Sequence, residues 1–194
     1  MKTLDEILAF AANVDGQGIE DHQNCTYMRS ELFALASRLY DLRLGARIVE
    51  IGVFGGRSTS LYLQLQTTQA FDIHLIDNWS WNQALAAHQF TNLILDNFNE
   101  VPFTLHKMRS DYLGEFYWTL PIDFIHIDGW HDMPGIEPDC RLWLPHVVSG
   151  GIAAFHDSDS PAVAECIQKY VNDAGWELIE TAHRTTTWRK PCLT

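Results

Sequence analysis

Polar residues follow four of the apolar runs that we predict to be buried strands. Glu50, Asp77 and Asp128 each stand at such a strand end, and so does the pair His156 and Asp157. A single acid in this position is as often a helix cap or a solvated loop residue as a ligand-binding group. The carboxyl ends of parallel strands share one edge of a sheet, so these groups are expected to converge. Together they predict a polar ligand site at that edge.

The segment Ala46–Leu61, ARIVEIGVFGGRSTSL, predicts a strand, a glycine loop and the start of a helix. Gly52 and Gly56 let the backbone approach a bound molecule, and the helix brings its positive end to the same place. Phe54 stands where a dinucleotide-binding loop needs glycine, and the lysine of a P-loop is missing. Glu50 would repel a polyphosphate and instead suits a ligand with a positive charge. The loop therefore predicts a cofactor site that fits phosphates poorly.

The composition limits the class of protein. With 194 residues, 46% of them hydrophobic, the chain has the size and composition of one globular enzyme domain. A formal net charge of −12 argues against a nucleic-acid partner, and no apolar run reaches the roughly 20 residues of a membrane helix. The four cysteines lack CxxC spacing, and the amphipathic N-terminus does not resemble a signal peptide. We therefore expect reduced thiols and a cytoplasmic protein that binds neither nucleic acid nor membrane.

Helical and strand-like segments alternate, which predicts an α/β fold with a mostly parallel sheet covered on both faces. The last two strand-like runs are too close for a helical crossover and predict an antiparallel hairpin. The expected fold is a Rossmann-like, doubly wound sheet of seven strands in a single domain, 1–194, with an N-terminal helical segment (1–43) and a core (46–190). Gly45 is expected to end the second helix, and Gly150 with Gly151 to form the turn before the fifth strand. The expected strands are 46–52, 72–76, 103–107, 122–127, 152–155, 176–181 and 185–189, and the expected helices are 3–12, 28–43, 57–66, 82–98, 111–117, 135–143 and 161–174.

The motif VEIGVFGGRST, the acid after the second strand and the terminal hairpin resemble the class I S-adenosylmethionine-dependent methyltransferases over about residues 28–190. The loop is similar to the small-molecule O-methyltransferase variant E-I-G-x-x-x-G-x-S. The resemblance implies S-adenosylmethionine as cofactor, with Glu50 meeting its amino group through a hydrogen bond or a water. Gly52 and Ser58 would then lie beside the methionine part, and Gly56 would belong to the same loop.

Two further acids are assigned to the adenosine half of that cofactor. Asp77 follows Gly52 by 25 positions, close to the roughly 20-residue offset at which an acid after the second strand binds ribose hydroxyls. Asp111, just after the third strand, is expected to face the adenine amino group, although a helix N-cap at Asp111 or Ser110 explains that acid equally well.

A second pair of motifs, FIHIDGWHD (124–132) and GGIAAFHDSD (150–159), resembles the metal-dependent O-methyltransferases. These include the catechol and caffeoyl-CoA types, the macrocin-type sugar enzymes and the cephalosporin-hydroxylase-like group. The resemblance implies a divalent ion, usually magnesium, bound by Asp128, His156 and Asp157. His156 departs from the pattern, because imidazole is a poor magnesium ligand. Three alternatives stay open: the site binds a softer metal such as manganese, iron or zinc, His156 contacts the metal ligands and not the ion, or His156 has no part in metal binding.

His131 follows Asp128 by three residues. In the catechol-type enzymes a lysine general base has this spacing, and in the macrocin-type enzymes a histidine has it. The resemblance therefore implies that His131 is the general base, since an imidazole accepts a proton near neutrality. The alternative is a loop histidine bonded to a neighbouring carbonyl.

The leading hypothesis is a metal-assisted O-methyltransferase that acts on a small hydroxylated molecule. Trp79, Trp81 and Trp130 lie near the predicted sheet edge and are candidates for an acceptor pocket or a lid. One alternative is an enzyme of the same fold with another activity, as the hydroxylase-like relatives suggest. Another is a non-catalytic protein that binds S-adenosylmethionine or S-adenosylhomocysteine. Whether the N-terminal helices form a homodimer interface stays open.

Overall fold

The computed structural model describes residues 3–14, 29–80 and 83–192. Its centre is a seven-stranded sheet with the order β3-β2-β1-β4-β5-β7-β6. The first five strands in this order are parallel, and β7 runs antiparallel to both β5 and β6. The strands are β1 (Arg47–Ile51), β2 (Asp72–Ile76), β3 (Thr104–His106), β4 (Ile122–Ile127), β5 (Val147–Phe155), β6 (Glu177–Ala182) and β7 (Thr185–Arg189). The predicted fold class is confirmed.

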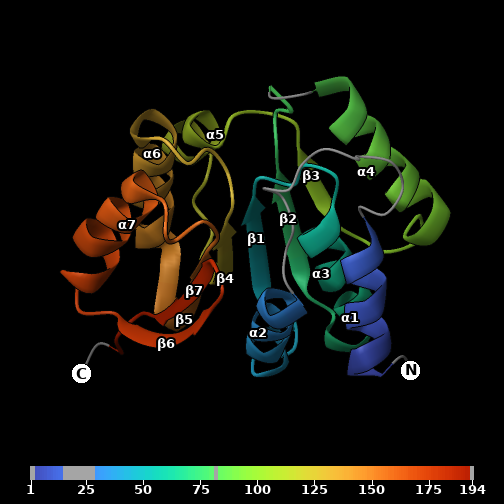
Figure 1. The fold of residues 1–194 in the computed structure, drawn as a ribbon, viewed down its shortest axis with the longest axis horizontal. Helices are drawn as coiled ribbons and strands as arrows, with labels where there is room; N and C mark the ends of the chain where they lie inside the picture. The colour runs from blue at the N-terminus through green and yellow to red at the C-terminus, as the bar shows by residue number, and fades with distance from the viewer. Residues whose placement is uncertain (1–2, 15–28, 81–82, 193–194) are drawn as a thin grey trace.

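Helices cover both faces of the sheet, with α1, α3 and α4 on one side and α5, α6 and α7 on the other (Figure 1). Each face has its own apolar core. Tyr62 and Phe124 belong to the first core, and Trp143 and Phe155 to the second, all fully buried. The helices are α1 (Leu4–Asn13), α2 (Arg29–Tyr40), α3 (Arg57–Gln69), α4 (Gln83–Asn97), α5 (Ser110–Phe116), α6 (Met133–Trp143) and α7 (Pro161–Ile167), with a 3₁₀ turn at Leu144–His146 and a π-helical turn at Gln168–Asn172.

The strand register brings the predicted strand ends to one edge. Ile51 at the end of β1 pairs with Ile76 of β2 and with Ile127 of β4. Ile127 in turn pairs with Phe155 of β5. The residues that follow these four strand ends therefore leave the sheet side by side, as the sequence predicted for a parallel arrangement.

Two glycine predictions were wrong. Gly150 and Gly151 lie inside β5, which begins at Val147, and the β4–β5 register shifts between Ile122 and Phe124. The positive φ of Gly150 (+76°) accommodates this irregularity within the strand. The second helix already ends at Tyr40, so Gly45 does not cap it, and its N–H instead donates to the carbonyl of Gln69.

Helix α6 begins two residues earlier than predicted because Asp132 caps it. The side chain of Asp132 accepts a hydrogen bond from the N–H of Gly135 at 3.1 Å. Within the described ranges, no helix is both long and apolar enough to cross a membrane.

Candidate functional site

The glycine loop between β1 and α3 lies directly against the end of β4. Gly52 has φ +90°, and a Cβ built on it would lie 2.1 Å from the carbonyl oxygen of Asp128. Any side chain would therefore separate the two strand ends. Gly56, with φ +91°, is the N-cap of α3, and a Cβ there would lie 2.7 Å from Leu93 of α4. Gly52 is required by close packing against backbone as well as by its conformation, whereas at Gly56 the positive φ is the stronger requirement, because the Leu93 side chain can shift.

Asp77 holds this loop through its carboxylate. One oxygen accepts the N–H groups of Val53 (2.9 Å) and Phe54 (2.8 Å), and the other accepts the N–H of Trp79 (2.6 Å). Phe54 and Trp79 have positive φ values of 47° and 48°, a strained conformation that these bonds stabilise. A carboxylate has about four acceptor positions, so capacity for about one further hydrogen bond remains at the predicted ribose-binding acid.

The sequence made Trp79 a candidate for an acceptor pocket or a lid, but its side chain is buried. Its ring is 5% exposed and packs on Phe90, and its Nε1 donates to the carbonyl of Phe54 at 2.9 Å. Trp130 is 56% exposed, and Trp81 lies outside the described residues.

Glu50 is fully enclosed. Its two carboxylate oxygens accept hydrogen bonds from the hydroxyls of Ser58 and Thr59, and His126 Nδ1 lies 3.6 Å from Oε1. Burial raises the pKa of this carboxyl, although His126 and the two hydroxyls oppose the effect. In this structure Glu50 has no exposed surface with which to meet a ligand. The expected bond to the cofactor's amino group is therefore not available directly, and Ser58 is engaged with Glu50.

The predicted metal ligands and the predicted base form one cluster at the ends of β4 and β5. His156 Nδ1 lies 3.0 Å from Asp128 Oδ1 and 3.4 Å from Asp157 Oδ2. His131 Nδ1 contacts the same Oδ2 of Asp157. His131 is half exposed, whereas His156 and Asp157 are buried. The structure thus brings together four residues that the sequence had assigned to chemistry.

The charges in this cluster depend on one another. Burial lowers the pKa of His156, but Asp128 and Asp157 outweigh it and the resulting pKa is about 10. The hydrogen bond to Asp157 raises the pKa of His131 against the effect of burial. Burial acts to raise the pKa of Asp157, yet the two histidines hold it well below its usual range. Asp128 and Asp157 therefore favour the protonated, positively charged forms of the neighbouring histidines.

Two residues that the sequence analysis missed complete the cluster. Arg184, in the turn between β6 and β7, places Nη2 2.6 Å from Asp157 Oδ1. Glu31 of α2 is fully buried, accepts the N–H of Arg184 at 2.9 Å and lies 3.8 Å from His156 Nε2. One feature of the sequence could have identified Glu31 as a buried acid. It stands four positions before Leu35, on the apolar face of the predicted helix.

The donor set fits a divalent ion. Asp128, His156 and Asp157 offer one ligand atom each, all within 4.8 Å of one another. His156 turns Nδ1 toward the acids and Nε2 toward Glu31, which matches the carboxylate that commonly stands behind a metal-ligating histidine. Two carboxylates with one imidazole suit manganese, iron or zinc better than magnesium.

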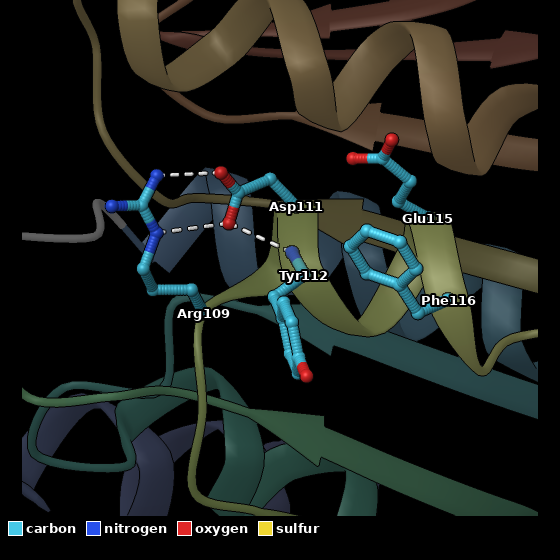
Figure 2. Close-up of a pocket in the computed structure, with 5 residues that line it drawn as sticks. All are labelled: Arg109, Asp111, Tyr112, Glu115 and Phe116. Carbon is cyan, nitrogen blue, oxygen red and sulfur yellow. Dashed lines mark hydrogen bonds and ion pairs between the residues drawn. The ribbon is translucent and has the colours of Figure 1, made fainter.

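Asp111 lies in an open surface pocket of 410 Å³ that is lined by α5 and the residue before it (Figure 2). Arg109 Nε and Nη2 bind the Asp111 carboxylate at 2.9 and 2.5 Å, and the N–H of Tyr112 donates to it at 2.8 Å. The guanidinium lowers the pKa of the carboxyl. Asp111 does not act as the N-cap, because Arg109 holds that position.

The sheet order, the antiparallel terminal hairpin and the glycine loop against the acid-bearing strand ends define a class I S-adenosylmethionine-dependent methyltransferase. Residues 49–158 match a family model described as a methyltransferase domain. Because the match covers more than half of the chain, the protein belongs to this family. None of the curated proteins matches the chain significantly.

Solved structures show the same fold. The O-methyltransferase NovP superposes with a TM-score of 0.73 at 14% identity, over 96% of this chain and 99% of NovP. TomG from Streptomyces achromogenes, an O-methyltransferase solved with S-adenosylmethionine, gives 0.62 at 18% identity, over 98% and 92%. CalS11, a TDP-rhamnose 3′-O-methyltransferase, gives 0.60 at 15% identity, over 97% and 96%. At sequence identities this low, the likeness to these structures shows a shared fold and no more.

Proposed function

We propose that this protein transfers the methyl group of S-adenosylmethionine to a hydroxyl oxygen of a small molecule, with help from a divalent ion. The observation that carries the proposal is the contact between Gly52 and the Asp128 carbonyl. It makes the cofactor loop and the acid–histidine cluster direct neighbours. A methyl donor in the loop and an acceptor at the cluster would then meet at one edge of the sheet.

The loop is proposed to bind the methionine half of the cofactor through its backbone, since Glu50 and Ser58 are bonded to each other. Glu50 would act as a buried negative charge beneath the loop, which favours a ligand with a cationic amino group and sulfonium. The remaining acceptor capacity of Asp77 would bind a ribose hydroxyl. Asp111 would face the adenine amino group in the pocket of Figure 2.

Asp128, Asp157 and Nδ1 of His156 would hold the metal ion, which would polarise the acceptor oxygen and lower the pKa of its hydroxyl. His131 would take the hydroxyl proton on Nε2, because Nδ1 is engaged by Asp157. This contact fixes the ring and strengthens the imidazole as a base, as the raised pKa of His131 indicates. The oxygen lone pair then forms the bond to the methyl carbon as the carbon–sulfur bond breaks toward sulfur.

A small hydroxylated acceptor is proposed on two grounds. NovP, TomG and CalS11 are named as O-methyltransferases, and CalS11 for a hydroxyl of TDP-rhamnose. The formal net charge of −12 disfavours a nucleic-acid acceptor.

A second candidate is the same transfer without a metal ion. Both oxygens of Asp157 already contact nitrogen atoms of basic side chains, Arg184 at Oδ1 and His131 at Oδ2. In that case Asp157 would only orient the base, as the acid does in other Asp–His pairs.

Calorimetry with S-adenosylhomocysteine, with NAD as the nucleotide control, tests the cofactor class. Radiolabelled S-adenosylmethionine and a panel of hydroxylated molecules test transfer, each with Mn²⁺, Mg²⁺ or EDTA. We expect S-adenosylhomocysteine to bind and NAD not to bind, and transfer to stop with EDTA and return with Mn²⁺. Transfer that persists in EDTA supports the metal-free candidate. Binding without transfer to any acceptor contradicts the methyltransferase proposal.

A further inference from the structure

Asp139 of α6 is a buried acid that the proposed mechanism does not use. Its side chain is 2% exposed, and burial raises the pKa of its carboxyl to about 7, while the bond from Ser110 opposes this shift. Burying a carboxyl group costs free energy unless it has polar partners, so the contacts of Asp139 indicate what it does. One partner lies at the start of α5 and the other in the loop after β4.

The first partner is Ser110, the first residue of α5. Its hydroxyl donates to Asp139 Oδ1 at 2.5 Å. One helical turn further along α6, Trp143 Nε1 donates to the carbonyl of the same serine at 3.2 Å. Gly114 lets the two helices come this close, because a Cβ on it would lie 2.9 Å from Trp143 Nε1. Helix α6 therefore holds the start of α5 by two hydrogen bonds.

The second partner is Gly129, the residue after Asp128. A Cβ built on Gly129 would lie 3.2 Å from Asp139 Oδ2. The carboxylate thus contacts the start of α5 with one oxygen and packs against the loop after β4 with the other. Between Gly129 and the first residue of α6 stand Trp130, the proposed base His131 and Asp132.

The residues next to Ser110 form the pocket of Figure 2, in which Arg109 grips the Asp111 carboxylate. We infer that Asp139 is a positioning residue, which holds the Arg109–Asp111 turn in register with the loop after β4 and so supports binding of the adenosine half of the cofactor. This inference rests on the proposed function. A residue that served only the core would stabilise the fold and leave cofactor affinity unchanged.

Three substitutions separate these roles. Asp139→Asn keeps an oxygen that accepts the Ser110 hydroxyl, Asp139→Leu removes it, and Ser110→Ala removes the donor. Calorimetry with S-adenosylhomocysteine measures the dissociation constant, and thermal unfolding checks that each variant is folded at the assay temperature. We expect about tenfold weaker binding for Ser110→Ala and for Asp139→Leu, the effect of losing one buried hydrogen bond. Asp139→Asn should stay within about threefold of the parent protein.

The double variant Asp139→Leu/Ser110→Ala completes the cycle. If Asp139 acts through Ser110, the double variant binds no more weakly than either single variant. Additive losses, parent-like affinity in Asp139→Leu, or equal losses in Asp139→Asn and Asp139→Leu would each overturn the inference. If Asp139→Leu does not fold, parent-like affinity in Ser110→Ala overturns it alone. Absence of binding to the parent protein instead contradicts the proposed function.

Discussion

Gly52 and Asp128 touch through their backbones at the ends of β1 and β4, where a Cβ on Gly52 would lie 2.1 Å from the Asp128 carbonyl oxygen. The N–H of Asp128 also donates to the carbonyl of Ile51 at 2.8 Å. The proposed cofactor loop and the first proposed metal ligand are therefore fixed relative to each other by the sheet itself. This relationship makes the geometry of the site sensitive to a single methyl group.

Gly52→Ala is expected to damage both stability and cofactor binding. The positive φ costs about 1–2 kcal/mol for alanine, and overpacking against the Asp128 backbone adds about 1–3 kcal/mol. Chemical denaturation and calorimetry with S-adenosylhomocysteine measure the two effects. Gly175→Ala is the matched control, because Gly175 has φ +76° but a Cβ on it would meet nothing within 4 Å. Equal losses in both variants would show that the contact with Asp128 is unimportant.

Asp128→Asn is expected to abolish metal-dependent transfer and to leave the affinity for S-adenosylhomocysteine nearly unchanged. The amide is a weaker metal ligand than the carboxylate, and the backbone contact with Gly52 is preserved. Activity with Mn²⁺ and calorimetry measure the two quantities, and Asp96→Asn on the exposed face of α4 controls for the loss of one charge. Unchanged turnover in Asp128→Asn contradicts the metal proposal.

His131→Gln is expected to lower turnover by about 10²–10⁴-fold, with little change in cofactor affinity. Glutamine removes the titrating group. His88→Gln, on α4, is the control, since His88 contacts Asn92 within its own helix at 3.1 Å. A variant that turns over at the parent rate would exclude His131 as the base.

The edge of the sheet at which the site lies was predictable, because it depends on local patterns. Apolar runs that end in Asp77, Asp128 and His156 predict parallel strands whose ends meet, and the register confirms this. The partners of those residues were not predictable. Glu31 reaches His156 and Arg184 across most of the chain, and nothing within a short window of sequence encodes such a contact.

Burial changed the interpretation of Glu50 for a similar reason. Its position near the end of an apolar strand predicted an acid at the surface of the site, but it lies inside β1, and Ser58 and Thr59 fold back over it and use both of its oxygens. The prediction of a turn at Gly150 and Gly151 was wrong for another reason. Paired glycines favour turns, but these two lie within the irregular strand β5.

Asp139 is expected to make stability depend on pH between about 4 and 7. Its folded pKa is raised from 3.8 to about 7, so the folded state keeps the proton while the unfolded state loses it. The stabilisation is complete below about pH 4 and is lost as the pH rises through about 7, with a limit on the order of 4 kcal/mol. Urea unfolding of the parent and Asp139→Asn from pH 4.5 to 8 measures this. Parallel curves for the two proteins contradict it, since the other titrating groups, Asp111 among them, are common to both.

Glu31→Gln is expected to weaken metal binding although Glu31 is not a proposed ligand. Its carboxylate faces His156 Nε2 at 3.8 Å and accepts the backbone N–H of Arg184 at 2.9 Å, so it orients the His156 ring and holds the backbone of the turn that carries Arg184. Loss of a carboxylate behind a metal-ligating histidine typically costs about 10–100-fold in metal affinity. Mn²⁺ titration followed by electron paramagnetic resonance measures that affinity without any substrate.

Glutamine keeps an oxygen for the Arg184 N–H, so Glu31→Gln should fold, and circular dichroism checks this. Glu165→Gln, an exposed acid on α7, removes the same charge far from any bond to His156 and should bind Mn²⁺ as the parent does. Parent-like affinity in Glu31→Gln would mean that His156 does not ligate the ion through Nδ1. If the parent protein itself binds no Mn²⁺, the metal-free mechanism with Asp157 as the orienting acid of His131 is favoured instead.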